Sequence, residues 1–268
     1  MEFYKFQCLG NDYIVIEELN CVDYSKLSIS LCDRKKGIGA LGLIVISKDY
    51  SKYTYYNDQG IINNRIGIGL FEYFEFIKLK GFNLKKKLKF ISSFNEIEAY
   101  KENDLTTVDL GKPMYKNQIL AISDGIDSFG RLLKVEDFHY TIYSVYLGEI
   151  YTIIFVDDLD SYICNNAELI AYNKLFKKKT NVCFVKKINE QTIQVKVFDY
   201  INKYNEFNVL ALASCALVGK SLRILDSNVN VYVDDEYVNV KIDRKENVTI
   251  SGKSNLVYVG NIGDEILC

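Results

Sequence analysis

The sequence predicts a mixed fold of α-helices and β-strands that contains more strand than helix. Many short segments are rich in β-branched and aromatic residues, which is typical of buried strands. Two longer segments carry apolar residues at intervals of three to four, which is typical of helices. The chain has 268 residues, of which 49% are hydrophobic, so it can form one large or two medium domains. Two lobes of similar size fit this length.

The first predicted strand lies at the amino terminus, where Phe3, Phe6 and Cys8 alternate with Lys5 and Gln7. This alternation is typical of a strand with one buried face, and it is not the basic and then apolar pattern of a signal peptide. The later predicted strands cover residues 13–16, 43–46, 53–56, 88–91, 151–156, 182–185, 193–198, 229–233, 238–242 and 248–250.

Two helices are predicted, each after a strand and a loop. Over residues 67–79 the apolar positions recur at helical spacing, and Gly81 is a suitable end. Residues 211–222 show the same spacing. The first turn of each helix holds a position of functional interest.

Composition excludes several functions. A net charge of -2 and a sequence pI of about 5.7 give no general attraction to nucleic acid or to an anionic membrane. Apolar runs are shorter than the roughly 20 residues that span a bilayer. Seven cysteines without paired spacing and a single histidine indicate neither a disulfide framework nor a zinc site. We expect a cytoplasmic protein with no cofactor, no metal and no nucleic-acid or membrane partner.

Six segments occur in an order that is informative as a set. They are Gly10-Asn11-Asp12-Tyr13, Asp33-Arg34 with residues 37–43, Tyr56-Asn57 with Gly60, residues 108–111 with Pro113, residues 155–159 and residues 180–185. Together they resemble the diaminopimelate epimerase family over nearly the whole chain. The resemblance implies an α/β (α+β) fold of two pseudo-symmetric lobes, each a curved, mostly antiparallel sheet around a central helix, with a ligand cleft between the lobes.

The resemblance also implies the domain boundaries. The amino-terminal lobe would cover residues 1–115 and be closed by part of the carboxyl-terminal segment, about 255–268. The carboxyl-terminal lobe would cover residues 116–254.

The two catalytic cysteines of that family are absent from this chain, where Ile66 and Leu210 occupy their positions. Inversion of an α-carbon requires a base on one face and an acid on the other, and neither replacement ionises. Loss of one positioned acid or base costs on the order of a hundred- to ten-thousand-fold in rate. Two-thiol epimerisation is therefore not expected. We expect a non-catalytic binding or partner protein instead.

Some features of the family's pocket remain. Asn11, Asn57 and Asn181 match three amides that line the substrate pocket in the family. The backbone N–H groups at the two helix starts could still bind a carboxylate, because they do not depend on side-chain identity. These groups belong to Gly67, Ile68, Ala211 and Leu212.

Other pocket positions differ from the family. Glu149 stands within the segment that corresponds to the family's Gly-Asn-Pro-His, and Tyr200 replaces the arginine of its Glu-Arg-Gly. Both changes disfavour a second carboxylate on the ligand. A small amino-acid-like ligand that is more apolar or cationic than diaminopimelate is expected.

Two alternatives to a non-catalytic protein remain at this point. A racemase or other cofactor-independent isomerase could use a carboxylate as its base, with Asp58, Asp199 and Glu206 as candidates, because burial raises a carboxyl pKa. A shifted alignment could make Cys215 a catalytic thiol. We interpret Cys215, like Cys8, Cys21, Cys32, Cys183 and Cys268, as a small buried hydrophobic residue. For the oligomeric state, a homodimer and a mixed dimer with an active homologue are further alternatives.

Overall fold

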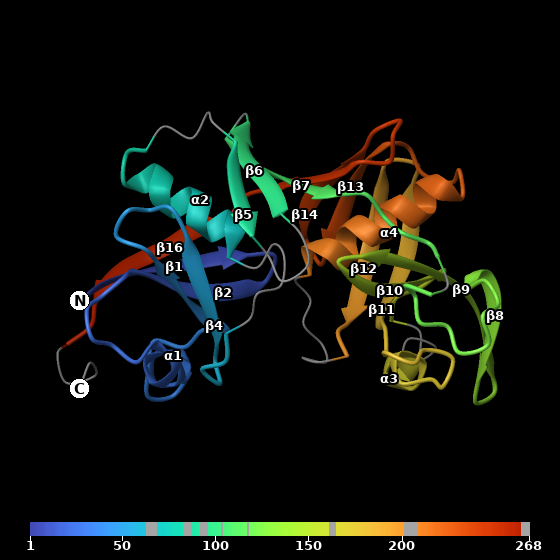
Figure 1. Cartoon of the computed structure of the whole chain (residues 1–268), viewed down its shortest axis with the longest axis horizontal. Coiled ribbons are helices and arrows are strands. Elements are labelled where there is room, and N and C mark those ends of the chain that lie inside the picture. The colour runs from blue at the N-terminus through green and yellow to red at the C-terminus, as the bar shows by residue number, and fades with distance from the viewer. Residues whose placement is uncertain are drawn as a thin grey trace. The chain divides into compact units, whose positions relative to one another are not determined.

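The computed structural model describes residues 1–62, 69–82, 87–91, 96–102, 104–116, 118–160, 165–200 and 208–263. The chain divides into two compact units (Figure 1). Unit 1 is Met1–Val108 together with Gly252–Cys268, and unit 2 is Asp109–Ser251. The described residues form sixteen strands and four helices, so the predicted mixed α+β class is confirmed.

Unit 1 is built on a five-stranded sheet in the order β16-β1-β2-β3-β4. Its pairs are antiparallel except β2–β3, which is parallel. A second antiparallel pair joins β5 to β6. These strands are β1 Glu2–Cys8, β2 Asn11–Glu17, β3 Gly42–Ile46, β4 Tyr53–Asn57, β5 Leu88–Ile91, β6 Glu96–Glu102 and β16 Asn255–Asn261. β7, Leu105–Gly111, carries the chain into unit 2.

Two helices cover opposite faces of the five-stranded sheet (Figure 1). α1, Tyr24–Cys32, contacts β3 and β4, and α2, Leu70–Leu79, contacts β1, β2 and β16. Side chains alternate between the faces, as strand geometry requires. Ile14 lies in the core cluster that contains α1 residues, whereas the ring of Tyr4 packs on Phe76 of α2.

Unit 2 contains a sheet with the strand order β15-β14-β13-β12-β11-β10-β9-β8. Its pairs are antiparallel except β10–β11 and β12–β13, which are parallel. The strands are β8 Phe129–Val135, β9 Phe138–Leu147, β10 Glu149–Phe155, β11 Asn181–Asn189, β12 Thr192–Phe198, β13 Asn228–Val233, β14 Glu236–Ile242 and β15 Val248–Gly252.

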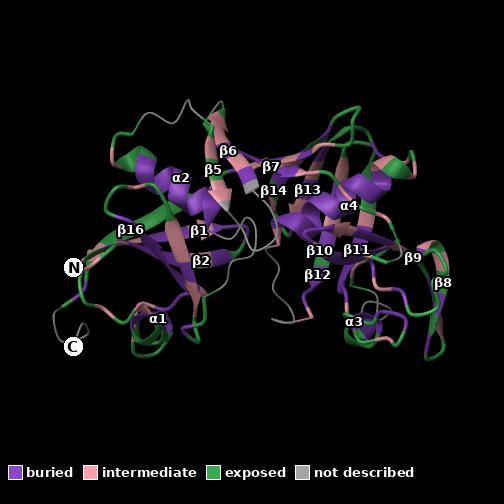
Figure 2. Cartoon of the chain, viewed as in Figure 1, coloured by how far each residue is buried: buried purple, intermediate pink, exposed green. Residues whose placement is uncertain are grey.

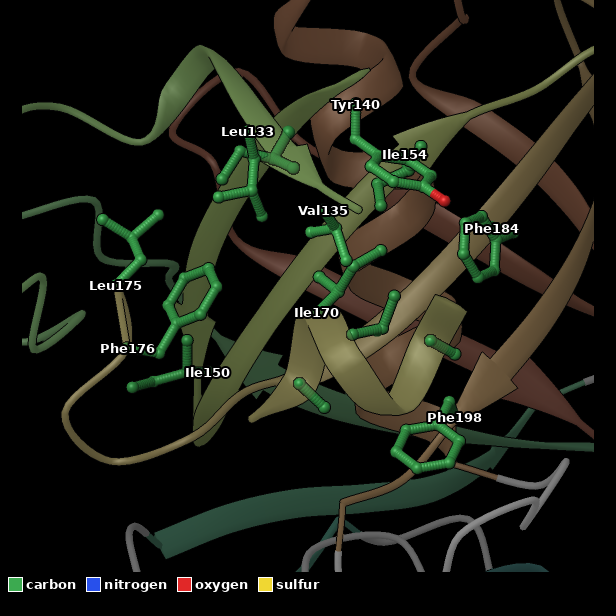
Figure 3. Close-up of a cluster of buried hydrophobic side chains, with 14 of the residues drawn as sticks. Leu133, Val135, Tyr140, Ile150, Ile154, Ile170, Leu175, Phe176, Phe184 and Phe198 are labelled. Carbon is green, nitrogen blue, oxygen red and sulfur yellow. The ribbon is translucent and has the colours of Figure 1, made fainter. Parts of the chain in front are cut away.

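Unit 2 also contains two helices of different character. The short α3, Ala167–Ala171, packs on β11 and β12. Its Ile170 belongs to an apolar cluster with Phe184 and Phe198 (Figure 3). α4, Val209–Ser221, contacts each of the strands from β9 to β14.

The central helices α2 and α4 are buried along most of their length (Figure 2). The buried residues are continuous over 70–77 in α2 and over 209–219 in α4. A helix without an exposed polar face over most of its length is expected inside a core. No helix in the described part of the chain is long and apolar enough to cross a membrane.

The glycines of the 37–39 segment allow close approach of the backbone after α1. A Cβ atom added to Gly37 would lie 2.3 Å from the carbonyl oxygen of Ser30 and 2.6 Å from that of Leu31. Gly39 has a φ of 78°, in the left-handed region. The segment therefore forms the turn between α1 and β3.

This geometry predicts that Gly37→Ala destabilises the protein, because the new methyl group collides with backbone oxygens that cannot move alone. We expect a loss of about 1–3 kcal/mol in the free energy of unfolding, measured by urea denaturation. Gly263→Ala is the matched control, since nothing lies within 4 Å of its Cβ position. Equal stability of the two variants would contradict the prediction.

Candidate functional site

In unit 2 the sheet brings polar residues together beside the start of α4. β10 and β11 are parallel neighbours, with Tyr151 opposite Asn181. The end of β12 lies next to the start of β11, because Phe198 pairs with Val182. Tyr200, two residues beyond this pair, thus follows at the same edge. Strand register therefore places residues distant in sequence in one cluster.

These side chains form a hydrogen-bonded network, which we call the α4 network. The Asn181 amide donates to Glu149 Oε2 at 3.0 Å, and Asn181 Oδ1 accepts from the Tyr200 N–H at 3.4 Å. The Tyr151 hydroxyl lies 3.3 Å from Glu149 Oε2 and 3.1 Å from Asn208 Oδ1. Three residues predicted from the sequence, Glu149, Asn181 and Tyr200, are thus brought together. Tyr151 and Asn208 were not predicted as site residues.

Asn208 is the N-cap of α4. Its Oδ1 accepts the N–H groups of Leu210 and Ala211, each at 3.1 Å, and its carbonyl oxygen accepts the N–H of Leu212 at 3.0 Å. An asparagine in this position commonly supplies such a cap. The N–H groups of Ala211 and Leu212 that we expected to hold a carboxylate therefore donate within the chain.

Leu210 lies at the first turn of α4 with only 2% of its surface exposed. Its side chain offers no ionisable atom at the position that the sequence resemblance assigns to a catalytic cysteine. Asp199, one of the predicted fallback acids, lies one residue before Tyr200 and is 1% exposed. Glu206, another fallback acid, lies outside the described residues.

In unit 1 the start of α2 differs from that of α4. Gly69 is the N-cap, with a φ of 80°, and it makes no side-chain capping bond. A Cβ atom there would lie 2.9 Å from the Tyr53 ring and 3.3 Å from Ile44, so glycine permits close packing against β3 and β4. The predicted site residues Ile66, Gly67 and Ile68 lie outside the described residues.

The other predicted residues of unit 1 lie on β2 and at the end of β4. Asn11 is buried at the start of β2. Asn57 Oδ1 accepts the N–H groups of Gln59 and Ile61 at 3.1 and 2.8 Å, so it holds the turn after β4. Asp58 is exposed in this turn. Its exposure removes the burial on which its role as a base depended.

Glu72, in the first turn of α2, is a buried acid that the sequence reasoning missed. It has no exposed surface, and neither carboxyl oxygen has a hydrogen-bond partner among the residues that the structure describes. Burial raises the pKa of Glu72 to about 7, against smaller opposing effects of its own backbone N–H and the nearby Ser254 hydroxyl. The Ser254 hydroxyl itself donates to the Gln7 carbonyl at 3.2 Å.

Glu72 influences three phenols, and one further acid influences Glu72. The charge of Glu72 raises the pKa of Tyr13 from β2 and of Tyr53 and Tyr55 from β4, and the charge of Glu75 from the same helix raises the pKa of Glu72. Burial is the main cause of the raised pKa of all three phenols. The sequence signal was a glutamate within the continuous aromatic and apolar run 70–77. An acid in such a run has no exposed helix face to occupy.

The cysteines follow the interpretation drawn from the sequence with one exception. Cys8, Cys32, Cys183 and Cys215 are buried, and burial raises the pKa of the Cys215 thiol well above its ordinary value. Cys21 is instead exposed, with a φ of 59° in the turn before α1, so its interpretation as a buried residue was wrong. Cys268 lies outside the described residues.

Solved structures identify the class of fold. The chain superimposes on a PhzF-family phenazine biosynthesis protein from Bacillus anthracis with a TM-score of 0.66 and 13% identity, over 97% of this chain and 98% of that one. A hydroxyproline epimerase from Agrobacterium vitis gives a TM-score of 0.57 and 10% identity, over 97% and 91%. The protein therefore has the fold of a class of epimerases and isomerases.

Sequence comparison identifies the family. Diaminopimelate epimerase of Elusimicrobium minutum is 32% identical over 216 residues, which cover 74% of this chain and 76% of that protein. Diaminopimelate epimerase of Caldanaerobacter subterraneus is 29% identical over 272 residues, which cover 98% and 99%. The chain belongs to the diaminopimelate epimerase family. No family model matches it.

The raised pKa of Glu72 predicts how stability depends on pH. The unfolded chain loses this proton near its ordinary pKa of 4.5, whereas the folded protein keeps it until about pH 7. The contribution of Glu72 to the free energy of unfolding is thus complete below pH 4.5 and falls as pH rises to about 7. Glu72→Gln removes this loss, so above pH 7 we expect it to exceed the wild type by up to about 3 kcal/mol.

Urea denaturation across this pH range measures the effect. Glu18→Gln, at an exposed position of unit 1, should retain the pH dependence of the wild type. If Glu72→Gln retains it too, Glu72 is not the group responsible.

Proposed function

We propose that this protein is a non-catalytic member of the diaminopimelate epimerase family that binds a small amino-acid-like ligand or a protein partner. Family membership supports an amino-acid epimerase or isomerase frame. The residues at the two catalytic positions, Ile66 and Leu210, have no ionisable side chain. The fold of the family is thus retained without the acid and base that inversion of an α-carbon requires.

The observation that carries this proposal is the start of α4. Leu210 is buried, and the N–H groups of Leu210 and Ala211 are capped by Asn208. An active site of this kind would use a helix start to lower a thiol pKa and to hold a substrate carboxylate. Here the N–H groups at the start of α4 are bonded to Asn208 and no thiol is present at Leu210. This supports the proposal that the helix start of unit 2 neither activates a thiol nor holds a substrate carboxylate.

Exchange of the α-proton in deuterated water tests the proposal. The protein is incubated with diaminopimelate isomers and a panel of L- and D-amino acids, and incorporated deuterium is read by mass spectrometry. We expect no exchange above a blank without protein, because each missing acid or base costs on the order of a hundred- to ten-thousand-fold in rate. A diaminopimelate epimerase with both cysteines serves as the positive control.

An isomerase with different catalytic groups is the second candidate, with Asp199 and Glu206 as the acids predicted from the sequence. Glu72 has no exposed surface and is not a candidate base. Exchange above the blank that is lost in Asp199→Asn or Glu206→Gln would replace the non-catalytic proposal with this one and would name the base.

The partner proposed for this protein is a second copy, docked through β16. This strand is at one edge of the five-stranded sheet, and its apolar residues are exposed: Leu256 40%, Val257 56%, Tyr258 45% and Val259 45%. An edge strand with exposed apolar residues is ready to pair with another strand. Two copies related by a two-fold axis could pair their β16 strands antiparallel.

Light scattering after size exclusion tests this dimer. The wild type should have about twice the chain mass of 30.9 kDa, and Val257→Lys should run as a monomer because a charge on an edge strand opposes pairing. Ile29→Lys, at another exposed apolar residue of unit 1, should remain dimeric. A monomeric wild type would exclude the homodimer.

A further inference from the structure

Glu72 is buried in the first turn of α2, the helix that contacts β1, β2 and β16. It has no exposed surface, and neither of its carboxyl oxygens bonds to a described residue. A neutral carboxyl group is tolerated in such a place, whereas a buried charge without a partner is costly. The protonation of Glu72 therefore bears on whether the elements around it stay packed.

The lysines around α2 bond to acids other than Glu72. The ion pairs that the structure shows here are Lys80 with Glu17 at 2.7 Å, Lys253 with Asp104 at 2.9 Å, Lys78 with Asp104, and Lys101 with Glu75. Because each of these four lysines has another acid as its partner, none of them forms an ion pair with a charge on Glu72.

The strands packed on α2 direct acids, phenols and one thiol toward it, and none of these groups is a cation. They are Glu2, Tyr4 and Cys8 of β1, Tyr13 and Glu17 of β2, and Tyr53 and Tyr55 of β4. In β16, Tyr258 packs instead on the ring of Phe3, on the face that α1 covers. The sheet thus supplies no positive charge to Glu72.

Glu72 lies beside the point where the carboxyl-terminal segment docks onto β1. The Ser254 hydroxyl lowers the pKa of Glu72, although burial raises it more. Ser254 is 1% exposed and donates to the Gln7 carbonyl of β1 at 3.2 Å, and Cys8 Sγ donates to the Lys253 carbonyl at 3.5 Å. We call residues 253–261, which comprise this docking point and β16, the carboxyl-terminal strap.

The strap is the element of this contact that can separate most readily. β16 is an edge strand with β1 as its one neighbour in the described sheet, whereas β1 and β2 each have a neighbour on both sides. Every residue of β16 except Gly260 is exposed (Figure 2). Segments with few buried contacts open at a lower free energy than the whole protein unfolds.

We propose that Glu72 is a proton-controlled latch for the carboxyl-terminal strap: the neutral carboxyl group keeps the strap docked, and ionisation promotes its local release, which hydrates the carboxylate and exposes the edge of β1. Release requires neither a ligand nor a second copy of the chain, so it is independent of the proposed function.

The direction of the pH dependence follows from the two states of Glu72. In the released state the carboxyl group loses its proton near its ordinary pKa of 4.5, whereas in the docked state its pKa is about 7. Docking is therefore strongest below pH 4.5, weakens as pH rises to about 7 and changes no further above that pH.

Hydrogen exchange of the backbone amides in the full-length protein, read by mass spectrometry from pH 5 to pH 8, tests the latch. After correction for the intrinsic pH dependence of exchange, the protection of residues 253–261 should fall by about a hundred-fold, since each pH unit up to about 7 changes the opening equilibrium about ten-fold. Protection of the strap should stay below that of β2 at each pH, because the release is local.

Variants assign the effect to Glu72. Glu72→Gln and Glu72→Met have no proton to lose, so the corrected protection of the strap should be constant from pH 5 to pH 8 in both. Two variants are used because one is polar and the other apolar, and a thermal melt verifies that each is folded. Glu18→Gln, at an exposed position of unit 1, should behave as the wild type.

Three results would each overturn the latch. They are strap protection that does not change with pH in the wild type, the same pH dependence in Glu72→Gln and Glu72→Met, and equal protection of the strap and β2, which would mean that the whole unit opens together. Exchange of the α-proton and light scattering test the proposed function separately, so failure of either would leave the latch unaffected.

Discussion

The central constraint on this structure is that each buried helix must find partners for the N–H groups of its first turn. α2 and α4 are buried over long continuous stretches, and the first N–H groups of a helix have no partner within the helix. A buried N–H without a partner costs about 1–3 kcal/mol. At α4 the side chain and carbonyl of Asn208 meet this demand, whereas at α2 the N-cap is Gly69, which has no side chain to offer.

This constraint links the strand order of unit 2 to the chemistry of its polar network. Asn208 takes part in capping α4 and also lies 3.1 Å from the Tyr151 hydroxyl. Tyr151 is opposite Asn181 in a parallel pair, so the register of β10 and β11 brings Glu149 within reach of both donors. A shift of that register by one residue would turn these side chains to the other face. The capping of α4, the register of β10 and β11 and the orientation of Glu149 therefore depend on one another.

Sequence reasoning succeeded where the signal is local. The strands at 13–16, 43–46 and 193–198 are rich in β-branched and aromatic residues, and both central helices were predicted close to their observed bounds. α1, α3 and the β8–β9 pair were missed, since α1 and α3 are short and exposed residues alternate with less exposed ones in β8 and at the start of β9. The role of Asn208 could not be predicted, because a cap depends on the exact helix start. The burial of Glu72 was indicated by the continuous run 70–77 and was missed.

The two units differ in how the polar groups near the start of their buried helix are bonded. In unit 2, each of Glu149, Tyr151, Asn181 and Asn208 has a hydrogen-bond partner in the α4 network. In unit 1, Glu72 is buried and neither of its carboxyl oxygens bonds to a described residue, and such a group lowers stability unless it is neutral. The polar groups near the start of α4 are hydrogen-bonded, whereas the Glu72 carboxyl group near the start of α2 is not bonded to any described residue. The two helix starts therefore contribute differently to stability. The network of unit 2 fixes the position of the Glu149 carboxylate, whereas in unit 1 the protonation of Glu72 affects the stability of the core.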